Sequence, residues 1–127
     1  MIEELYMLEE FYTKHSIYKS LFLCSSEIQE ELHKKLLEYD HSVINVDSIA
    51  DIVDFEESTK RVILINIDLW KNNKHSINKY ILPYQNLIVL YDLTEYQHIL
   101  IKHWIRIVNK YEYITDPDAK ILNLDDY

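Results

Sequence analysis

The sequence predicts a doubly wound α/β fold, in which helices cover both faces of a five-stranded parallel sheet. Its short apolar runs are rich in β-branched residues and continuous rather than alternating, as is typical of strands buried on both faces. Amphipathic stretches separate these runs, and hydroxyl residues that can cap a helix follow three of them. This alternation over 127 residues indicates one domain, residues 1–127, built from right-handed crossovers.

Each element is marked by its own residues. The predicted strands are residues 21–24, 43–46, 62–67 and 87–91, with a weaker fifth strand at 111–115. The amphipathic patterns predict helices over residues 27–39, 49–56, 74–82 and 95–110. Three pairs have the spacing of a capping box, namely Ser26 with Gln29, Ser48 with Asp51, and Thr94 with Gln97. Because the chain has no glycine, left-handed turn positions are expected on Asn or Asp, first of all at Asn72–Asn73.

The predicted helix over residues 95–110 is apolar around most of its circumference. One face is expected to pack on the sheet and consists of Tyr96, Ile99, Leu100 and Ile107. A second stripe consists of Ile101, Trp104, Ile105 and Val108. This second stripe is expected to be a protein-interaction surface through which the chain forms a homodimer. The alternative is that another part of the same chain, such as the N-terminal segment, covers it.

Composition excludes several classes of function. The chain has no glycine, where average usage of about 7% gives about nine residues. It therefore cannot form a glycine-based phosphate loop, dinucleotide fingerprint or nucleophile elbow, and no cofactor is expected. A formal net charge of −9 opposes direct binding to nucleic acid. No two of the six histidines are four residues apart, so no metal site is expected on a helix face.

The remaining sequence features favour a cytoplasmic protein without a membrane segment. The single cysteine cannot form an internal disulfide, which fits a reducing compartment. The first residues lack the basic and apolar regions of a signal peptide. No run approaches the roughly twenty apolar residues that cross a bilayer.

The strand–helix alternation and the segment Tyr113-Ile114-Thr115-Asp116-Pro117 resemble the receiver domain of bacterial response regulators, over roughly residues 18–117. The resemblance implies a flavodoxin-like sheet. It also implies that the phosphorylation machinery is lost. Ser25 and Ser26 stand at the positions of the family's acidic pair, and Asn66 stands at the position of its phosphoacceptor aspartate. Tyr91 stands at the position of the switch hydroxyl, and Asp116 at that of the lysine. The expected function is that of a pseudo-receiver, a regulatory interaction module that is not an enzyme.

The two ends of the chain depart from the receiver pattern. Only ten residues follow Pro117, which shortens the C-terminus relative to the family's last helix. Residues 1–17 precede the first strand and are predicted to form an added helix. Its apolar positions, at helical spacing, are Ile2, Leu5, Leu8 and Tyr12.

Two possibilities at the strand ends stay open. Four aspartates follow predicted strands and are expected at the carboxyl edge of the sheet, namely Asp47, Asp68, Asp92 and Asp116. They either form a cation site or serve as ordinary turn and capping residues. Separately, the segment from Leu21 through Cys24 to Ser26, followed by a helix, is similar to the phosphocysteine loop of phosphotransferase-system IIB domains. That resemblance implies a phosphoryl carrier using Cys24; otherwise Cys24 is a buried apolar residue.

Overall fold

The computed structural model describes residues 20–39, 43–54, 62–82, 87–110 and 120–123, and the statements below concern these residues. In chain order, the elements are β1 (Ser20–Cys24), α2 (Gln29–Tyr39), β2 (Val43–Asn45), α3 (Ile49–Asp54), β3 (Val62–Asn66), α4 (Ile67–Asn72), α5 (Lys74–Tyr80), β4 (Leu87–Tyr91), α6 (Glu95–Lys110) and β5 (Lys120–Asn123). The predicted α/β class is confirmed. The predicted N-terminal helix over residues 1–17 lies outside the described residues.

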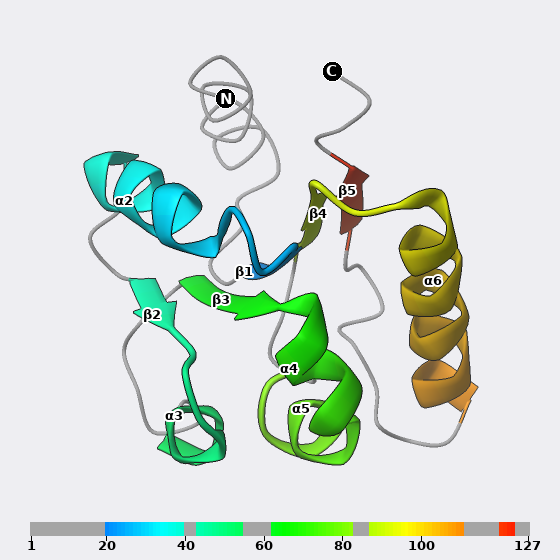
Figure 1. Ribbon diagram of the computed structural model, residues 1–127. Helices are drawn as coiled ribbons and strands as arrows, with labels where there is room; N and C mark the ends of the chain where they lie inside the picture. The colour runs from blue at the N-terminus through cyan, green and yellow to red at the C-terminus, as the bar shows by residue number, and fades with distance from the viewer. Residues whose placement is uncertain (1–19, 40–42, 55–61, 83–86, 111–119, 124–127) are drawn as a thin grey trace.

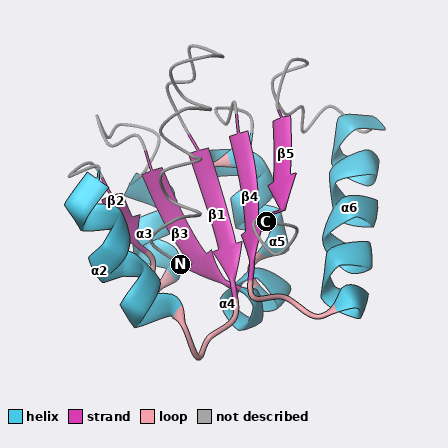
Figure 2. Ribbon diagram, turned by 90° about the horizontal axis from the view of Figure 1, so that it is seen from above, coloured by secondary structure: helices cyan, strands magenta, loops and turns pink. Residues whose placement is uncertain are grey.

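All strand pairs in the sheet are parallel, and the order is β2-β3-β1-β4-β5 (Figure 2). In the flavodoxin-like order 2-1-3-4-5, β1 lies beside β2. Here β3 takes that place, and β1 lies between β3 and β4. The register aligns Cys24 with Asn66 on one side and with Tyr91 on the other. The connections that follow β1, β3 and β4 therefore start at the same level.

Helices cover both faces of the sheet, as the continuous apolar runs predict. In Figure 1, α2 lies on one side of the sheet, and α3, α4 and α5 lie on the other. Side chains alternate along β1, so Leu21 and Leu23 belong to the core that includes residues of α3, α4, α5 and α6. Phe22 and Cys24 belong to the core under α2. Every residue of β1 is buried because it faces one or the other of these two cores.

The prediction of which face of α6 contacts the sheet was wrong. Ile101, Trp104 and Ile105, expected to form the interaction stripe, are 0%, 6% and 6% exposed and belong to the core. Tyr96 and Ile107, expected against the sheet, are 67% and 42% exposed. The side chain of Val108 lies outside the described part of the structure.

A tryptophan pair explains this orientation of α6. Trp104 contacts Trp70 of α4 edge-to-face, with ring centroids 5.5 Å apart and planes at 77°. Such a contact buries two of the largest apolar side chains at once and adds a favourable ring–ring interaction. The face that carries Trp104 therefore turns inward, and the face that carries Tyr96 turns to solvent.

The C-terminal part of the sheet also differs from expectation. The predicted strand at 111–115 lies outside the described residues, and the strand that pairs with β4 is β5, Lys120–Asn123. Asp116 precedes β5 in the chain, so it does not follow the last strand as the receiver lysine does. The predicted strand at 62–67 ends at Asn66, where α4 begins without having been predicted. Among the described residues, no helix is long and apolar enough to cross a membrane.

Candidate functional site

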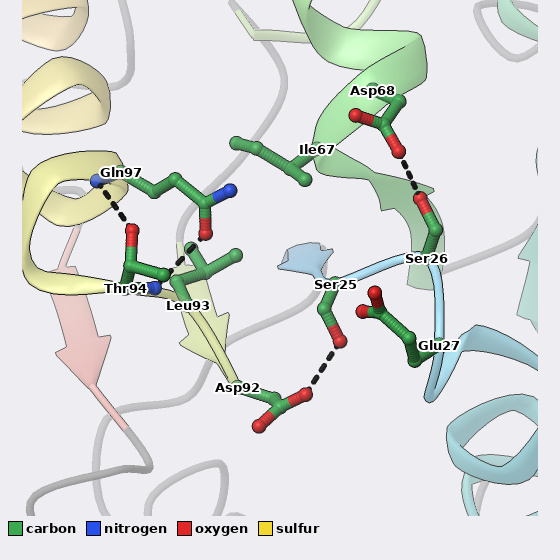
Figure 3. A pocket seen from close by; sticks show the side chains of 9 residues that line it. All are labelled: Ser25, Ser26, Glu27, Ile67, Asp68, Asp92, Leu93, Thr94 and Gln97. Carbon is green, nitrogen blue, oxygen red and sulfur yellow. Dashed lines mark hydrogen bonds between the residues drawn. The ribbon is translucent and has the colours of Figure 1, made fainter.

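A cavity of about 370 Å³ opens at the carboxyl ends of β1, β3 and β4 (Figure 3). Its described lining is contributed by the three connections that leave these strands: Ser25, Ser26 and Glu27 after β1, Ile67 and Asp68 after β3, and Asp92, Leu93, Thr94 and Gln97 after β4. The connection after β1 leads to α2 on one face of the sheet, and the other two lead to helices that share the opposite core. Neighbouring connections that part in this way create the crevice in which open α/β sheets bind ligands.

Two serine–aspartate hydrogen bonds hold the loop after β1 in place. Ser25 Oγ donates to Asp92 Oδ2 at 2.5 Å, and Ser26 Oγ donates to Asp68 Oδ2 (Figure 3). The first bond reaches the end of β4 and the second reaches the start of α4. The predicted capping box pairs Ser26 with Gln29, but α2 begins at Gln29 itself, and Ser26 Oγ donates to Asp68 across the edge of the sheet.

Amide side chains connect the ends of β3, β2 and α2. Asn66 Oδ1 accepts from the Leu69 N–H at 2.8 Å and so caps α4, while Asn66 Nδ2 donates to Gln29 Oε1 at 2.7 Å. Gln29 Nε2 in turn donates to Asn45 Oδ1 at 2.7 Å and to the Val46 carbonyl at 3.2 Å. The Leu69 N–H at one end and the Val46 carbonyl at the other fix the orientation of both amides. Asn66 therefore uses its amide to join secondary-structure elements.

The start of α6 forms the third wall of the cavity and is capped as predicted. The Thr94 N–H donates to Gln97 Oε1 at 2.9 Å, and the Gln97 N–H donates to Thr94 Oγ1 at 3.2 Å. These reciprocal bonds make a capping box. Asp92, two residues earlier, has φ of 54° and occupies the left-handed region. The predicted left-handed turn at Asn72–Asn73 was wrong, because Asn73 has φ of −133°.

The charge of the cavity is negative. Glu27, Asp68 and Asp92 contribute three carboxylates, and none of the described lining residues is Lys, Arg or His. No group of three or more His, Cys, Asp or Glu side chains in the described ranges could hold a metal ion. Asp47 is not among the lining residues; its N–H donates to the Asp51 carboxylate in the turn before α3. For Asp47, the structure favours the turn interpretation over a shared cation site.

Cys24 directly precedes the lining residue Ser25 and is itself not among the described lining residues of the cavity. Its side chain is fully buried in the core under α2, beside Phe22 and Leu32. Burial and, to a lesser extent, the negative charge of Asp92 raise the pKa of the thiol to about 12. A reactive cysteine needs the thiolate near neutral pH and access from solvent. Both properties oppose the phosphocysteine interpretation.

The structure brings together some of the predicted site residues and separates others. Ser25 and Ser26 line the cavity, and Asn66 lies in register with Cys24 at the same edge. Tyr91 ends β4 and packs against the core under α2. Asp116 lies outside the described residues.

The residue that sequence reasoning missed is Gln29. It forms three of the hydrogen bonds at the carboxyl edge, to partners on β2, on β3 and in the turn after β2. In the sequence it is one polar residue in the first turn of an amphipathic helix. Gln29 lies three residues after Ser26, and this spacing predicts a capping box between the two. The structure instead bonds the Gln29 side chain to Asn45, Val46 and Asn66.

Comparison with known proteins adds no relative to these observations. No family model matches the chain, and neither the curated proteins nor the solved structures contain a significant match.

Proposed function

We propose that this chain is a non-catalytic interaction module, similar to a receiver domain in its layered architecture and independent of phosphorylation. The observation that carries the proposal is the use of the polar groups at the carboxyl edge. Ser25, Ser26 and Asn66 hold three connections together through hydrogen bonds to Asp92, Asp68, Gln29 and Leu69. These bonds give each of the three side chains a structural role in positioning the loops.

The chemistry of position 66 supports the same proposal. An amide does not accept a phosphoryl group as a carboxylate does. Both ends of the Asn66 amide are also already bonded, one to a backbone N–H and one to another side chain. Phosphoryl transfer depends on a positioned divalent cation that neutralises the developing charge. The receiver acidic pair that holds such a cation corresponds here to Ser25 and Ser26, whose hydroxyls donate to Asp92 and Asp68.

Electrostatics disfavour a phosphate ligand in the cavity. A phosphoryl donor would enter beside three carboxylates with no cationic side chain among the described lining residues to balance them. Like charges in a confined, partly dehydrated space repel more strongly than in bulk water. The strand order differs from that of receivers, so the proposal rests on this site and not on analogy of fold.

Phosphorylation assays test this proposal directly. The full chain is incubated with acetyl phosphate or beryllofluoride in millimolar Mg²⁺, and intact mass and the melting temperature are measured. We expect no added phosphoryl mass and no beryllofluoride-dependent stabilisation. A genuine receiver, run in parallel, controls for reagent activity. A hydroxylamine-sensitive phosphoryl adduct on any aspartate would overturn the proposal, and Asp68→Asn and Asp92→Asn would locate it.

A further inference from the structure

The outer face of α6 carries a stripe of three large apolar side chains in contact with solvent, with the exposed His103 between Ile99 and Ile107. Tyr96, Ile99 and Ile107 are 67%, 58% and 42% exposed. Among the described residues, these three are the large hydrophobic side chains that are exposed to solvent. Leu100, on the same side, is only partly buried. In two views α6 lies at the margin of the described structure, beside the last strands of the sheet (Figures 1 and 2). Adjacent exposed apolar side chains of this size mark interaction surfaces.

We propose that this stripe binds the same stripe of a second copy, with the two α6 helices antiparallel about a two-fold axis. The inference rests on the proposed function as an interaction module and names its partner. Tyr96 and Ile107 are eleven residues apart, which is three helical turns, so they lie on one side of the helix. A two-fold axis between residues 101 and 102 places Tyr96 opposite Ile107 of the second copy, and the reverse, and it brings Ile99 near the exposed His103 of the second copy.

Charge selects the antiparallel arrangement. Glu95 and Arg106 are also eleven residues apart and share one flank of the stripe, and both are exposed. The same axis brings Glu95 near Arg106 of the second copy, twice in each dimer. In a parallel pair Glu95 and Arg106 would stay about 16 Å apart along the helices and would form no such pair. Lys102 lies near the axis, where its exposed ammonium group can extend into solvent. Ion pairs at such a rim set orientation more than affinity.

The size of the surface sets the strength of the contact. One helix pair buries less than the roughly 1,200 Å² in total at which stable dimers begin. We therefore expect a weak dimer that forms reversibly at high micromolar concentration, as is usual for regulatory contacts of this size.

Sedimentation of the full chain over a range of concentrations tests the interface. The wild type is expected to shift from monomer toward dimer as concentration rises. Ile99→Glu is expected to remain monomeric, with an unchanged far-UV spectrum and melting temperature. Lys71→Gln makes the same change in net charge at an exposed site on α4 and is expected to dimerise like the wild type. A wild type that is monomeric at all concentrations, or an Ile99→Glu variant that dimerises equally well, would overturn the proposal.

A charge exchange tests the orientation. Glu95→Arg and Arg106→Glu are each expected to weaken the dimer several-fold, and the double variant is expected to restore it. Absence of rescue in the double variant contradicts the antiparallel two-fold. These outcomes can be distinguished from those of the phosphorylation assays. If the protein stays monomeric and accepts no phosphoryl group, the proposed interface is wrong and the non-catalytic assignment is unchanged.

Discussion

Replacing Asn66 by aspartate would restore the residue type that receivers phosphorylate, and we expect it to destabilise this fold without creating a phosphoacceptor. In the wild type, Asn66 Oδ1 accepts from the Leu69 N–H and Asn66 Nδ2 donates to Gln29 Oε1 at 2.7 Å. A carboxylate preserves the first bond and replaces the donor of the second with an acceptor. Two acceptor oxygens then face each other at hydrogen-bond distance.

Gln29 cannot remove this conflict by rotating its amide. Rotation would direct its Nε2 at position 66, but it would also turn Oε1 toward the Val46 carbonyl, which Nε2 now contacts at 3.2 Å. Asn45 can rotate to follow, whereas a backbone carbonyl cannot become a donor. The lost bond and the unpaired acceptor cost about 1–3 kcal/mol. A negative charge at the start of α4 returns about 0.3–1 kcal/mol. The expected net loss in the free energy of unfolding is therefore centred on about 1 kcal/mol, with an upper bound of about 2.7 kcal/mol.

Urea unfolding at neutral pH measures this loss, with Asn72→Asp as a control that makes the same chemical change at an exposed position. The penalty at position 66 should shrink as pH falls, because a protonated carboxyl regains a donor for Gln29. The control, whose charge lies at the C-terminal end of α4, should show only the smaller effect of the helix dipole. If Asn66→Asp equals or exceeds the wild type in stability at neutral pH, the amide network does not carry the role assigned to it. If it also accepts phosphoryl from acetyl phosphate, the edge retains receiver chemistry.

Three further predictions follow from burial and backbone geometry. Ile105→Glu should unfold the chain, because it puts a charge into the core at a cost of several kcal/mol, whereas Ile99→Glu should stay folded. Circular dichroism and urea titration distinguish the two variants. A folded Ile105→Glu variant would contradict the orientation of α6. The Cys24 thiol has a pKa of about 12 when folded, against 9.0 as its ordinary value. Its stabilising contribution is complete below pH 9 and declines from pH 9 toward 12, because the unfolded thiol releases its proton first. The wild type should therefore lose about 1 kcal/mol more than Cys24→Ala between pH 8 and 10; equal losses in urea would refute this. Asp92→Ala should be about 1 kcal/mol less stable than Asp92→Gly. Both variants delete the bond from Ser25, but only glycine fits the left-handed backbone without strain. Equal free energies of unfolding for the two variants would show that the positive φ carries no cost.

The local pattern of side chains was enough to predict the layers of the fold. In β1, Leu21 and Leu23 face one core while Phe22 and Cys24 face the other, so a run without polar residues indicates a strand covered on both faces. The capping box at Thr94 and Gln97 was predictable for the same reason, since its two bonds join residues three positions apart. Both predictions depend on neighbours in the sequence.

Features that depend on distant contacts were not predictable in this way. Both sides of α6 are apolar, and the inward side is the one whose Trp104 packs on Trp70 of α4 and whose Ile101 and Ile105 enter the same core. The place of β3 between β2 and β1 is likewise decided by tertiary packing. At the site, Gln29 bonds to Asn66, 37 residues away, and no local pattern indicates that pair.

The absence of glycine connects the backbone of the site to its chemistry. A left-handed residue is needed after β4, and without glycine the side chains that tolerate this conformation best are those of Asn and Asp. The chain uses Asp92, whose carboxylate then accepts from Ser25 and ties the loop after β1 to the end of β4. That choice places a negative charge at the carboxyl edge, where phosphate-binding α/β proteins present backbone N–H groups of glycine-rich turns. The residue that makes the turn possible therefore also disfavours a phosphate ligand at this edge, which supports the proposed phosphorylation-independent function.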